Sequence, residues 1–140
     1  MPESVPSRTR ATLGQNETYG GRTVTRPYSA SDAADSCAAF PAVELIYPFG
    51  PDTQVYKVVG RMFAAMNAHG EHPRITLKSD PEDAKALVSE FVDIAPGYHM
   101  NKKHWISVDL PTGNAPLGEL IRASYELVVA GLPKAERPKP

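Results

Sequence analysis

The stretch from Pro96 to Asp109 brings more binding chemistry together than any other part of the sequence. Its fourteen residues, PGYHMNKKHWISVD, hold the only Trp of the chain, two of its four His and the adjacent pair Lys102 and Lys103. Lysine ammonium groups bind phosphate or carboxylate, and aromatic rings offer faces on which bases stack. The segment therefore predicts a binding surface, and no complete set of catalytic residues surrounds it.

Two classes of ligand fit this segment. In the first, the segment joins cations of neighbouring strands and turns to contact the phosphates of double-stranded DNA. The expected DNA contacts are Lys57, Arg61, Lys78, Lys102, Lys103 and His104. In the alternative, the same surface holds a small anion or a protein partner. The expected pocket residues are Tyr98, His99, Asn101 and Trp105, although Trp105 also suits packing at the edge of the core.

Residues that suit catalysis or metal binding are isolated along the chain. His69 and His72 flank Glu71, but a zinc site uses three or four ligands and no third ligand is evident. Cys37 is the single cysteine and lies on the apolar side of a predicted helix, so we expect a buried, inert thiol. Ser124 is expected to be a packed hydroxyl on a helix. We therefore expect no enzyme, no bound metal and no cofactor.

The composition is that of one ordinary globular domain. Of its 140 residues, 41% are hydrophobic and 22% charged. A formal net charge of −1 excludes a strongly basic protein, so DNA binding would have to rest on a local patch. A single cysteine permits no internal disulfide, and no apolar run approaches the about 18 residues of a membrane span. The N-terminus lacks the apolar core of a signal peptide, so we expect a cytoplasmic protein.

The two ends of the chain differ from its middle. Residues 1–28 show no apolar periodicity and contain Arg8, Arg10, Arg22 and Arg26, which predicts a flexible N-terminal extension. The folded domain is expected over 29–133. Residues 134–140, KAERPKP, are expected to form a charged tail.

Period-two alternation and helix caps predict the elements of the domain. Strands are expected at 43–47, 54–66, 74–79 and 105–110. The second of these is a hairpin that turns at Val59 and Gly60; a two-residue loop would pair Lys57 with Met62 and Tyr56 with Phe63. Helices are expected from caps at Ser31 and Asp80 and from Pro116 onward. This order predicts an α+β domain of two layers, with helices on one face of an antiparallel sheet and the other face partly exposed.

Several short segments also carry a family resemblance. They are Pro48–Asp52, Val55–Val58, Gly60–Ala64, Leu77–Lys78, Asp80–Pro81, Pro96–Trp105, Ser124–Tyr125 and Leu127–Val128. Together they resemble the MmcQ/YjbR-like family of small bacterial proteins over about residues 29 to 133. The resemblance implies a compact two-layer fold with an antiparallel sheet and a proposed double-wing DNA-binding surface. It implies no agreed catalytic residue and no cofactor.

Overall fold

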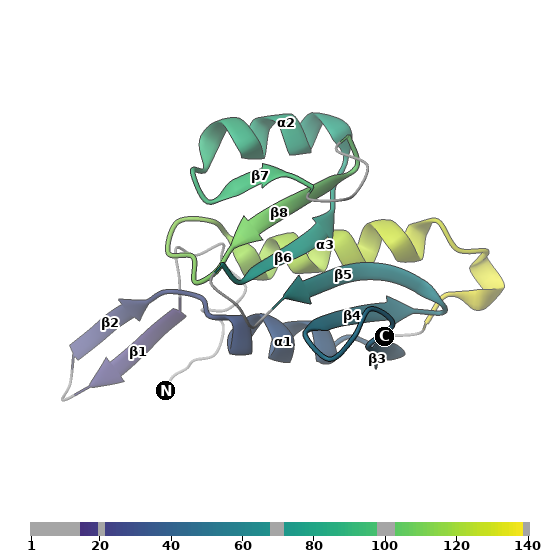
Figure 1. Ribbon diagram of the computed structural model, residues 1–140, viewed down its shortest axis with the longest axis horizontal. Helices are drawn as coiled ribbons and strands as arrows, with labels where there is room; N and C mark the ends of the chain where they lie inside the picture. Colours follow the sequence, from purple (N-terminus) through teal and green to yellow (C-terminus); the bar gives the residue numbers. More distant parts are fainter. Residues whose placement is uncertain (1–14, 20–21, 68–71, 98–102, 139–140) are drawn as a thin grey trace.

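The computed structural model describes residues 15–19, 22–67, 72–97 and 103–138. Within them the main feature is a six-stranded antiparallel sheet with the strand order β3-β4-β5-β6-β8-β7 (Figure 1). Its strands are β3 (Val43–Ile46), β4 (Thr53–Val58), β5 (Arg61–Asn67), β6 (Arg74–Lys78), β7 (Ile94–Pro96) and β8 (Trp105–Asp109). The predicted α+β class with an antiparallel sheet is confirmed.

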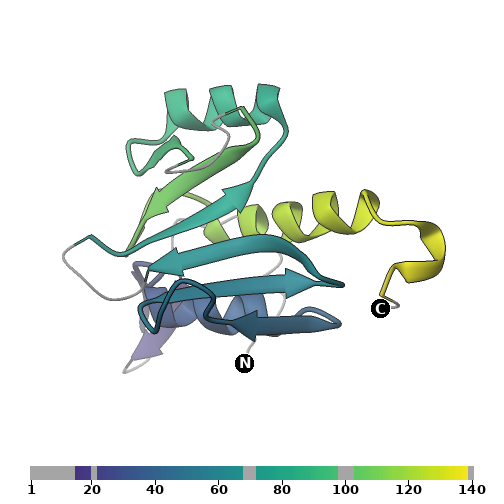
Figure 2. The same ribbon diagram turned by 45° about the vertical axis from the view of Figure 1, so that its right-hand side comes forward.

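Three α-helices cover one face of this sheet. They are α1 (Ala30–Ala38), α2 (Pro81–Glu90) and α3 (Leu117–Ala130). In both views α1 and α3 lie behind the strands, and α2 lies beside β7 (Figures 1 and 2). One continuous core contains residues of the helices and of the strands, among them Cys37, Ala84 and Ile121. Within the described residues, no helix combines the length and the apolar character that crossing a bilayer requires.

The strand register separates the two faces of the sheet. Ile94, Val108, Ile75 and Met66 are successive cross-strand neighbours, and all are buried against the helices. Because side chains alternate along a strand, the residues between them point to the opposite side, which we call the outer face. The outer face carries Glu44, Val55, Lys57, Met62, Ala65, Arg74, Thr76, Lys78, Trp105, Ser107 and Asp109.

The centre of the outer face is more buried than predicted. Val55, Thr76 and Ser107 are 1%, 7% and 3% exposed, and the hydroxyls of Thr76 and Ser107 lie 3.2 Å apart in a hydrogen bond. These side chains are short, and longer ones such as Lys78 and Trp105 flank them along the same strands. The stems of long side chains cover their neighbours while the polar ends stay in water. The exposed part of this face is therefore its rim.

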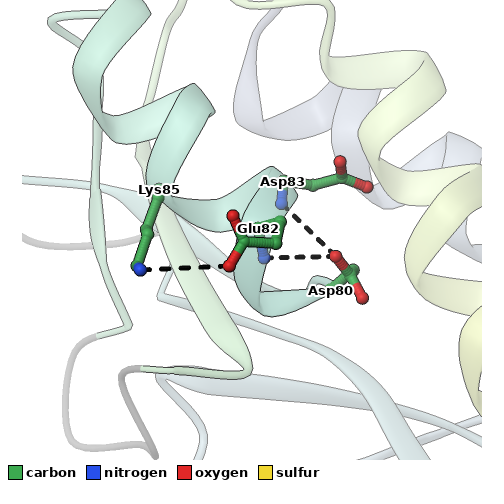
Figure 3. Close-up of polar contacts among 4 residues, drawn as sticks. All are labelled: Asp80, Glu82, Asp83 and Lys85. Atoms are coloured by element: carbon green, nitrogen blue, oxygen red, sulfur yellow. Dashed lines mark hydrogen bonds and ion pairs between the residues drawn. The ribbon is translucent and has the colours of Figure 1, made fainter.

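Helix α1 begins two residues earlier than predicted. The Ser29 hydroxyl accepts a hydrogen bond from the Asp32 backbone N–H at 3.1 Å, and the Asp32 carboxylate accepts one from the Ser29 N–H at 2.9 Å. This reciprocal capping box satisfies two backbone donors at once, so Ser29 and not Ser31 is the cap. The cap of α2 is Asp80, as predicted, and its carboxylate accepts from the N–H groups of Glu82 and Asp83 (Figure 3).

The hairpin β4–β5 has the predicted turn and one of the two predicted residue pairs. Val59 and Gly60 have φ values of 49° and 78°, as in the mirror-image turns that favour tight hairpins. Lys57 pairs with Met62 as expected, but Tyr56 pairs with Ala64 because a bulge lies between Tyr56 and Lys57. Phe63 is the extra residue of β5, and it still packs with Tyr56 in the core, with ring centroids 6.4 Å apart. A bulge of one residue leaves no mark in the apolar pattern, so the sequence did not predict it.

The N-terminal extension contains a hairpin that the sequence analysis did not predict. Strands β1 (Gln15–Tyr19) and β2 (Arg22–Arg26) pair antiparallel and form their own two-stranded sheet. The missed signal is a pair of Thr-containing runs on either side of Gly20-Gly21, a dipeptide that favours hairpin turns. Tyr28 then exchanges two backbone hydrogen bonds with Thr112, at 2.8 and 3.0 Å.

The residues after α3 fold back onto its end. A short 3₁₀ helix, η2 (Lys134–Glu136), leads to Arg137, whose guanidinium donates to the carbonyls of Leu132 and Ala130 at 3.0 Å each. A cation at this position satisfies carbonyl groups left free at a helix C-terminus. Part of the predicted charged tail is thus a cap for α3.

Candidate nucleic-acid interface

Two of the predicted DNA contacts, Lys57 and Lys78, lie on the outer face of the sheet. Lys57 is in β4 opposite Glu44 and Met62, and Lys78 is in β6 opposite Trp105. Both lysines are half-buried, which is consistent with stems lying along the sheet and ammonium groups reaching solvent. The structure therefore brings these two cations to one face, two strands apart.

The remaining described contacts lie at the ends of strands. Arg61 is exposed at the start of β5, directly after the turn, and Lys103 and His104 are exposed before β8. The His104 carbonyl accepts a hydrogen bond from the Ser79 N–H at 2.8 Å, which holds this end of β8 beside β6. Lys102 of the predicted DNA contacts, and Tyr98, His99 and Asn101 of the predicted pocket, lie outside the described residues.

Gly97 fixes the start of the 96–109 segment, which the sequence predicts to be a binding surface. Its N–H donates to the Trp105 carbonyl at 2.7 Å, and a Cβ atom at Gly97 would lie 2.6 Å from the Trp105 Cβ. No side chain fits at that distance, so the close approach requires glycine. Residues 97 and 105 are thus held together where the segment leaves and rejoins the sheet.

A buried hydroxyl on α3 fixes the position of Lys78. Ser124 is fully buried; its hydroxyl donates to the Phe63 carbonyl at 2.5 Å and accepts from the Lys78 N–H at 2.8 Å. Strands β5 and β6 separate at this point, and the Ser124 hydroxyl takes the place of a direct backbone hydrogen bond between them. Ser124 is therefore a structural residue, as expected, and it links the helix layer to the outer face.

Charge is distributed unequally between the two layers. The three helices and their caps carry many carboxylates: Asp32, Asp35, Asp80, Glu82, Asp83, Glu90, Glu119 and Glu126. The helices themselves carry two cations, Lys85 and Arg122, and Arg137 caps the end of α3. On the described part of the outer face and at the strand ends around it, cations outnumber carboxylates by five to four, the carboxylates being Glu44, Asp52, Asp93 and Asp109. These cations are Lys57, Arg61, Arg74, Lys78 and Lys103. The net charge of −1 hides this separation.

Arg74 is not among the predicted DNA contacts, although its position follows from the strand pattern. Arg74 lies on the outer face at the far end of β6 from Lys78, opposite Asp109 of β8. The two cations are four positions apart along one strand, in which each residue adds about 3.3 Å. Arg74 thus extends the cationic rim across the sheet.

The buried thiol and phenol of the core are unsuited to acid–base chemistry. Cys37 is fully buried, as expected, and burial raises the pKa of its thiol to about 12. Burial likewise raises the pKa of the Tyr56 hydroxyl to about 12, and this hydroxyl donates to Gln54 Oε1 at 2.8 Å. In the described ranges, no three His, Cys, Asp or Glu side chains gather in a way that suits a metal ion; His69 and Glu71 lie outside those ranges.

An open groove lies beside the rim, between α2 and the ends of β7 and β8. Its volume is about 520 Å³. Ala84, Val88 and Pro96 contribute apolar surface, and Lys85 and Lys103 contribute cations. The sequence placed Lys103 at the site but gave no reason to bring α2 beside it.

Comparisons with known proteins identify the family. The YjbR family model matches residues 38–127, and the chain belongs to the YjbR family. One relative, the uncharacterized protein YbdF of Escherichia coli O157:H7, is 44% identical over 99 residues, which are 69% of this chain and 81% of YbdF. The uncharacterized protein YjbR of Escherichia coli strain K12 is 33% identical over 111 residues, 76% of this chain and 92% of that protein.

Two crystal structures share the fold. Deinococcus radiodurans protein DR2400, a DUF419 domain, superimposes with a TM-score of 0.69 at 38% identity and covers 78% of this chain and 85% of its own. A protein from Pseudomonas syringae gives a TM-score of 0.62 at 25% identity, over 71% of this chain and 97% of its own. These similarities agree with the α+β fold and with the family resemblance of the sequence. They assign no activity.

Proposed function

We propose that this cytoplasmic protein binds double-stranded DNA through phosphate contacts of the outer face and its rim, without catalysing a reaction. The supporting observation is the separation of charge: cations gather on the outer face and its rim, and carboxylates gather on the helices. Phosphates attract the first layer and repel the second, so the domain would approach DNA in one orientation.

The spacing of the cations suits a phosphate backbone. Adjacent strands of a regular sheet lie about 4.8 Å apart, and β5 and β6 separate at Lys78, so the backbones of Lys57 and Lys78 lie at least about 10 Å apart. Two cations at this separation can reach different phosphates. The half-buried stems also limit the freedom that each side chain would lose on binding. Contacts of this kind position a protein on DNA and do not read its sequence.

Fluorescence anisotropy with a labelled random duplex tests this proposal. We expect saturable binding at about 50 mM salt that is largely lost at about 200 mM. The double variant Lys57→Ala/Lys78→Ala should bind DNA more weakly. The slope of log binding constant against log salt concentration should become about 1.8 less steep, since each phosphate contact contributes about 0.9.

The matched control is Lys85→Ala/Arg122→Ala, which removes the same charge from the helix layer. It should leave both the affinity and the salt slope nearly unchanged. Equal effects of the two double variants would show that only net charge matters. Absence of binding at about 50 mM salt would refute the DNA proposal for this chain.

A second candidate is the binding of a small anion in the groove between α2 and β7. The groove favours it because its lining is largely apolar and holds Lys103 and Lys85, although Lys85 lies 3.9 Å from Glu82 of the same lining. Such a site suits a molecule that carries a carboxylate or phosphate on an apolar body. Such a ligand should bind at one site per chain in a calorimetric titration. Lys85→Ala should weaken that binding, whereas the same substitution should leave DNA affinity intact.

A further inference from the structure

A second groove separates α2 from α3 on the helix side of the domain. Its volume is about 290 Å³. Its floor includes Ile106 of β8, and its apolar walls are formed by Leu87 of α2 and by Leu120 and Leu127 of α3. Leu127 is 38% exposed, so part of this apolar wall is in contact with water.

A second apolar stripe on α3 lines the groove, opposite Ala86 and Leu87 of α2. The sheet-facing side of α3 buries Ile121, Tyr125 and Val128, whereas Leu120, Ala123 and Leu127 follow at helical spacing on the adjacent side. Helices that pack directly lie 8 to 10 Å apart with their ridges interlocked. Here the stripe of α3 and Leu87 of α2 line an open groove instead.

Three carboxylates lie among the residues that line this groove. Asp80 and Asp83 stand at the start of α2, and Glu119 lies in the first turn of α3. Lys78, at the end of β6, is the one cation among the residues that line it. Asp80 is occupied as the helix cap, while the Asp83 side chain extends away from the cap (Figure 3). The rim of the groove is therefore negative.

Other carboxylates of the same helices are neutralised locally. Glu82 lies 3.9 Å from Lys85, and Glu126 lies 4.0 Å from Arg122, each within one turn of its own helix. Among the described residues, no ion pair links Asp83 or Glu119 to a cation. The carboxylates that face the groove thus remain available to a cationic partner.

We propose that the groove between α2 and α3 binds a basic amphipathic helix of a partner protein. The apolar side of that helix would cover Leu87, Leu120 and Leu127. Its Lys or Arg residues would pair with Asp83 and Glu119. An apolar stripe of α3 that faces Leu87 of α2, together with acidic residues at the rim, offers what such a helix recognises in a groove. The interaction lies on the layer opposite the outer face and goes beyond the proposed DNA contacts.

The test uses a synthetic peptide of about 18 residues, long enough for five helical turns. It contains only Leu and Lys, with Leu at positions i, i+3, i+4 and i+7, and carries fluorescein for anisotropy with the full chain. A second peptide has the same composition in scrambled order. We expect the periodic peptide to bind at least about tenfold more tightly than the scrambled one, because only the periodic order forms an apolar stripe.

Variants then locate the binding site. Asp83→Lys/Glu119→Lys should weaken binding of the periodic peptide about tenfold. The matched control, Glu82→Lys/Glu126→Lys, makes the same charge change outside the acidic rim and should change affinity by less than about twofold, because exposed ion pairs contribute little. Asp83→Asn/Glu119→Gln keeps the shape of both side chains and should show a smaller loss in the same direction, which guards against a misfolded charge-reversal variant.

Three results would overturn the proposal. The first is absence of periodic-peptide binding. The second is equal binding of the periodic and scrambled peptides, which would indicate general charge attraction. The third is equal weakening by the groove and control variants, since the peptide would then bind elsewhere on the helix layer.

Discussion

The outer face of the sheet and the helix layer carry opposite charge for different physical reasons. Several carboxylates of the helix layer have a role in folding, because Asp32 and Asp80 satisfy backbone N–H groups and favour the positive end of a helix dipole. Lys57 and Lys78 have no comparable role, since strand positions of this kind need no cation. The comparison teaches that a charge without a structural purpose is the better indicator of function.

Breaking the link between the two layers should have the largest effect. Ser124→Ala removes the hydroxyl that joins the Phe63 carbonyl to the Lys78 N–H, and leaves two buried groups unsatisfied. We expect a loss of about 2 to 4 kcal/mol in the free energy of unfolding, measured by urea denaturation. Weaker DNA binding should accompany it, because β6 no longer holds Lys78 in place. Ala123→Ser, on the same helix, serves as the exposed control.

High pH should weaken the core shared by both layers. The pKa of Cys37 is raised from 9.0 to about 12 in the folded chain, so the unfolded chain loses its proton first. This group's contribution is therefore complete below pH 9 and is lost as pH rises toward 12. Over that range the free energy of unfolding should fall by up to about 1.4 kcal/mol per pH unit.

Urea denaturation at pH 8 and pH 10 measures this decline. Tyr56, whose pKa is also raised to about 12, adds to it only above its ordinary value of 10.0. Cys37→Ala should reduce the difference between the two pH values. An unchanged difference in that variant would mean that the thiol does not contribute.

Removing a capping carboxylate from the helix layer should cost stability and leave DNA binding intact. Asp80→Ala deletes the acceptor for the Glu82 and Asp83 N–H groups and should lower the free energy of unfolding by about 1 kcal/mol. Glu90→Ala is the control, because a carboxylate at the last residue of α2 opposes the helix dipole. Thermal denaturation followed by circular dichroism compares the two. Equal destabilisation would contradict the structural role assigned to Asp80.

Removing a cation from the outer face should have the smallest effect on stability and a selective effect on DNA. Lys57→Ala should change the free energy of unfolding by less than about 0.5 kcal/mol. The dependence of log DNA affinity on log salt concentration should become less steep by about 0.9. A clear loss of stability together with unchanged DNA binding would show that Lys57 stabilises the fold and does not contact DNA.

Much of the fold was predictable because its signals are local. Asp80 followed by Pro81 marks the start of α2, and the Val59-Gly60 turn fixes the pairing of Lys57 with Met62. Period-two alternation also predicts that Arg74 and Lys78 share a face. The bulge at Tyr56 and the capping box at Ser29 were missed, since each depends on a choice between neighbouring residues of similar type.

The missing parts of the site depend on distant contacts. Ser124 lies 61 residues from Phe63 and 46 from Lys78, so the sequence near Ser124 does not indicate that its hydroxyl bonds both residues. Gly97 is required by Trp105, which the chain brings back only through the antiparallel pairing of β7 and β8. The separation of charge is different, because it follows from assigning each charged residue to a predicted helix or strand. The sequence therefore contains enough information to predict it.

Helix α1 shows that the folded unit is larger than the segment that the family model matches. The family match begins at residue 38, yet Ala33 and Cys37 are fully buried in the core, and Tyr28 is hydrogen-bonded to Thr112. A fragment cut at the edge of the match would lose nearly the whole of this helix and open the core to water. The boundary of the family match marks where the sequence agrees with the family model. The boundary of the folded unit lies at the outermost residue that helps to cover the core. For this chain that limit lies at or before Tyr28.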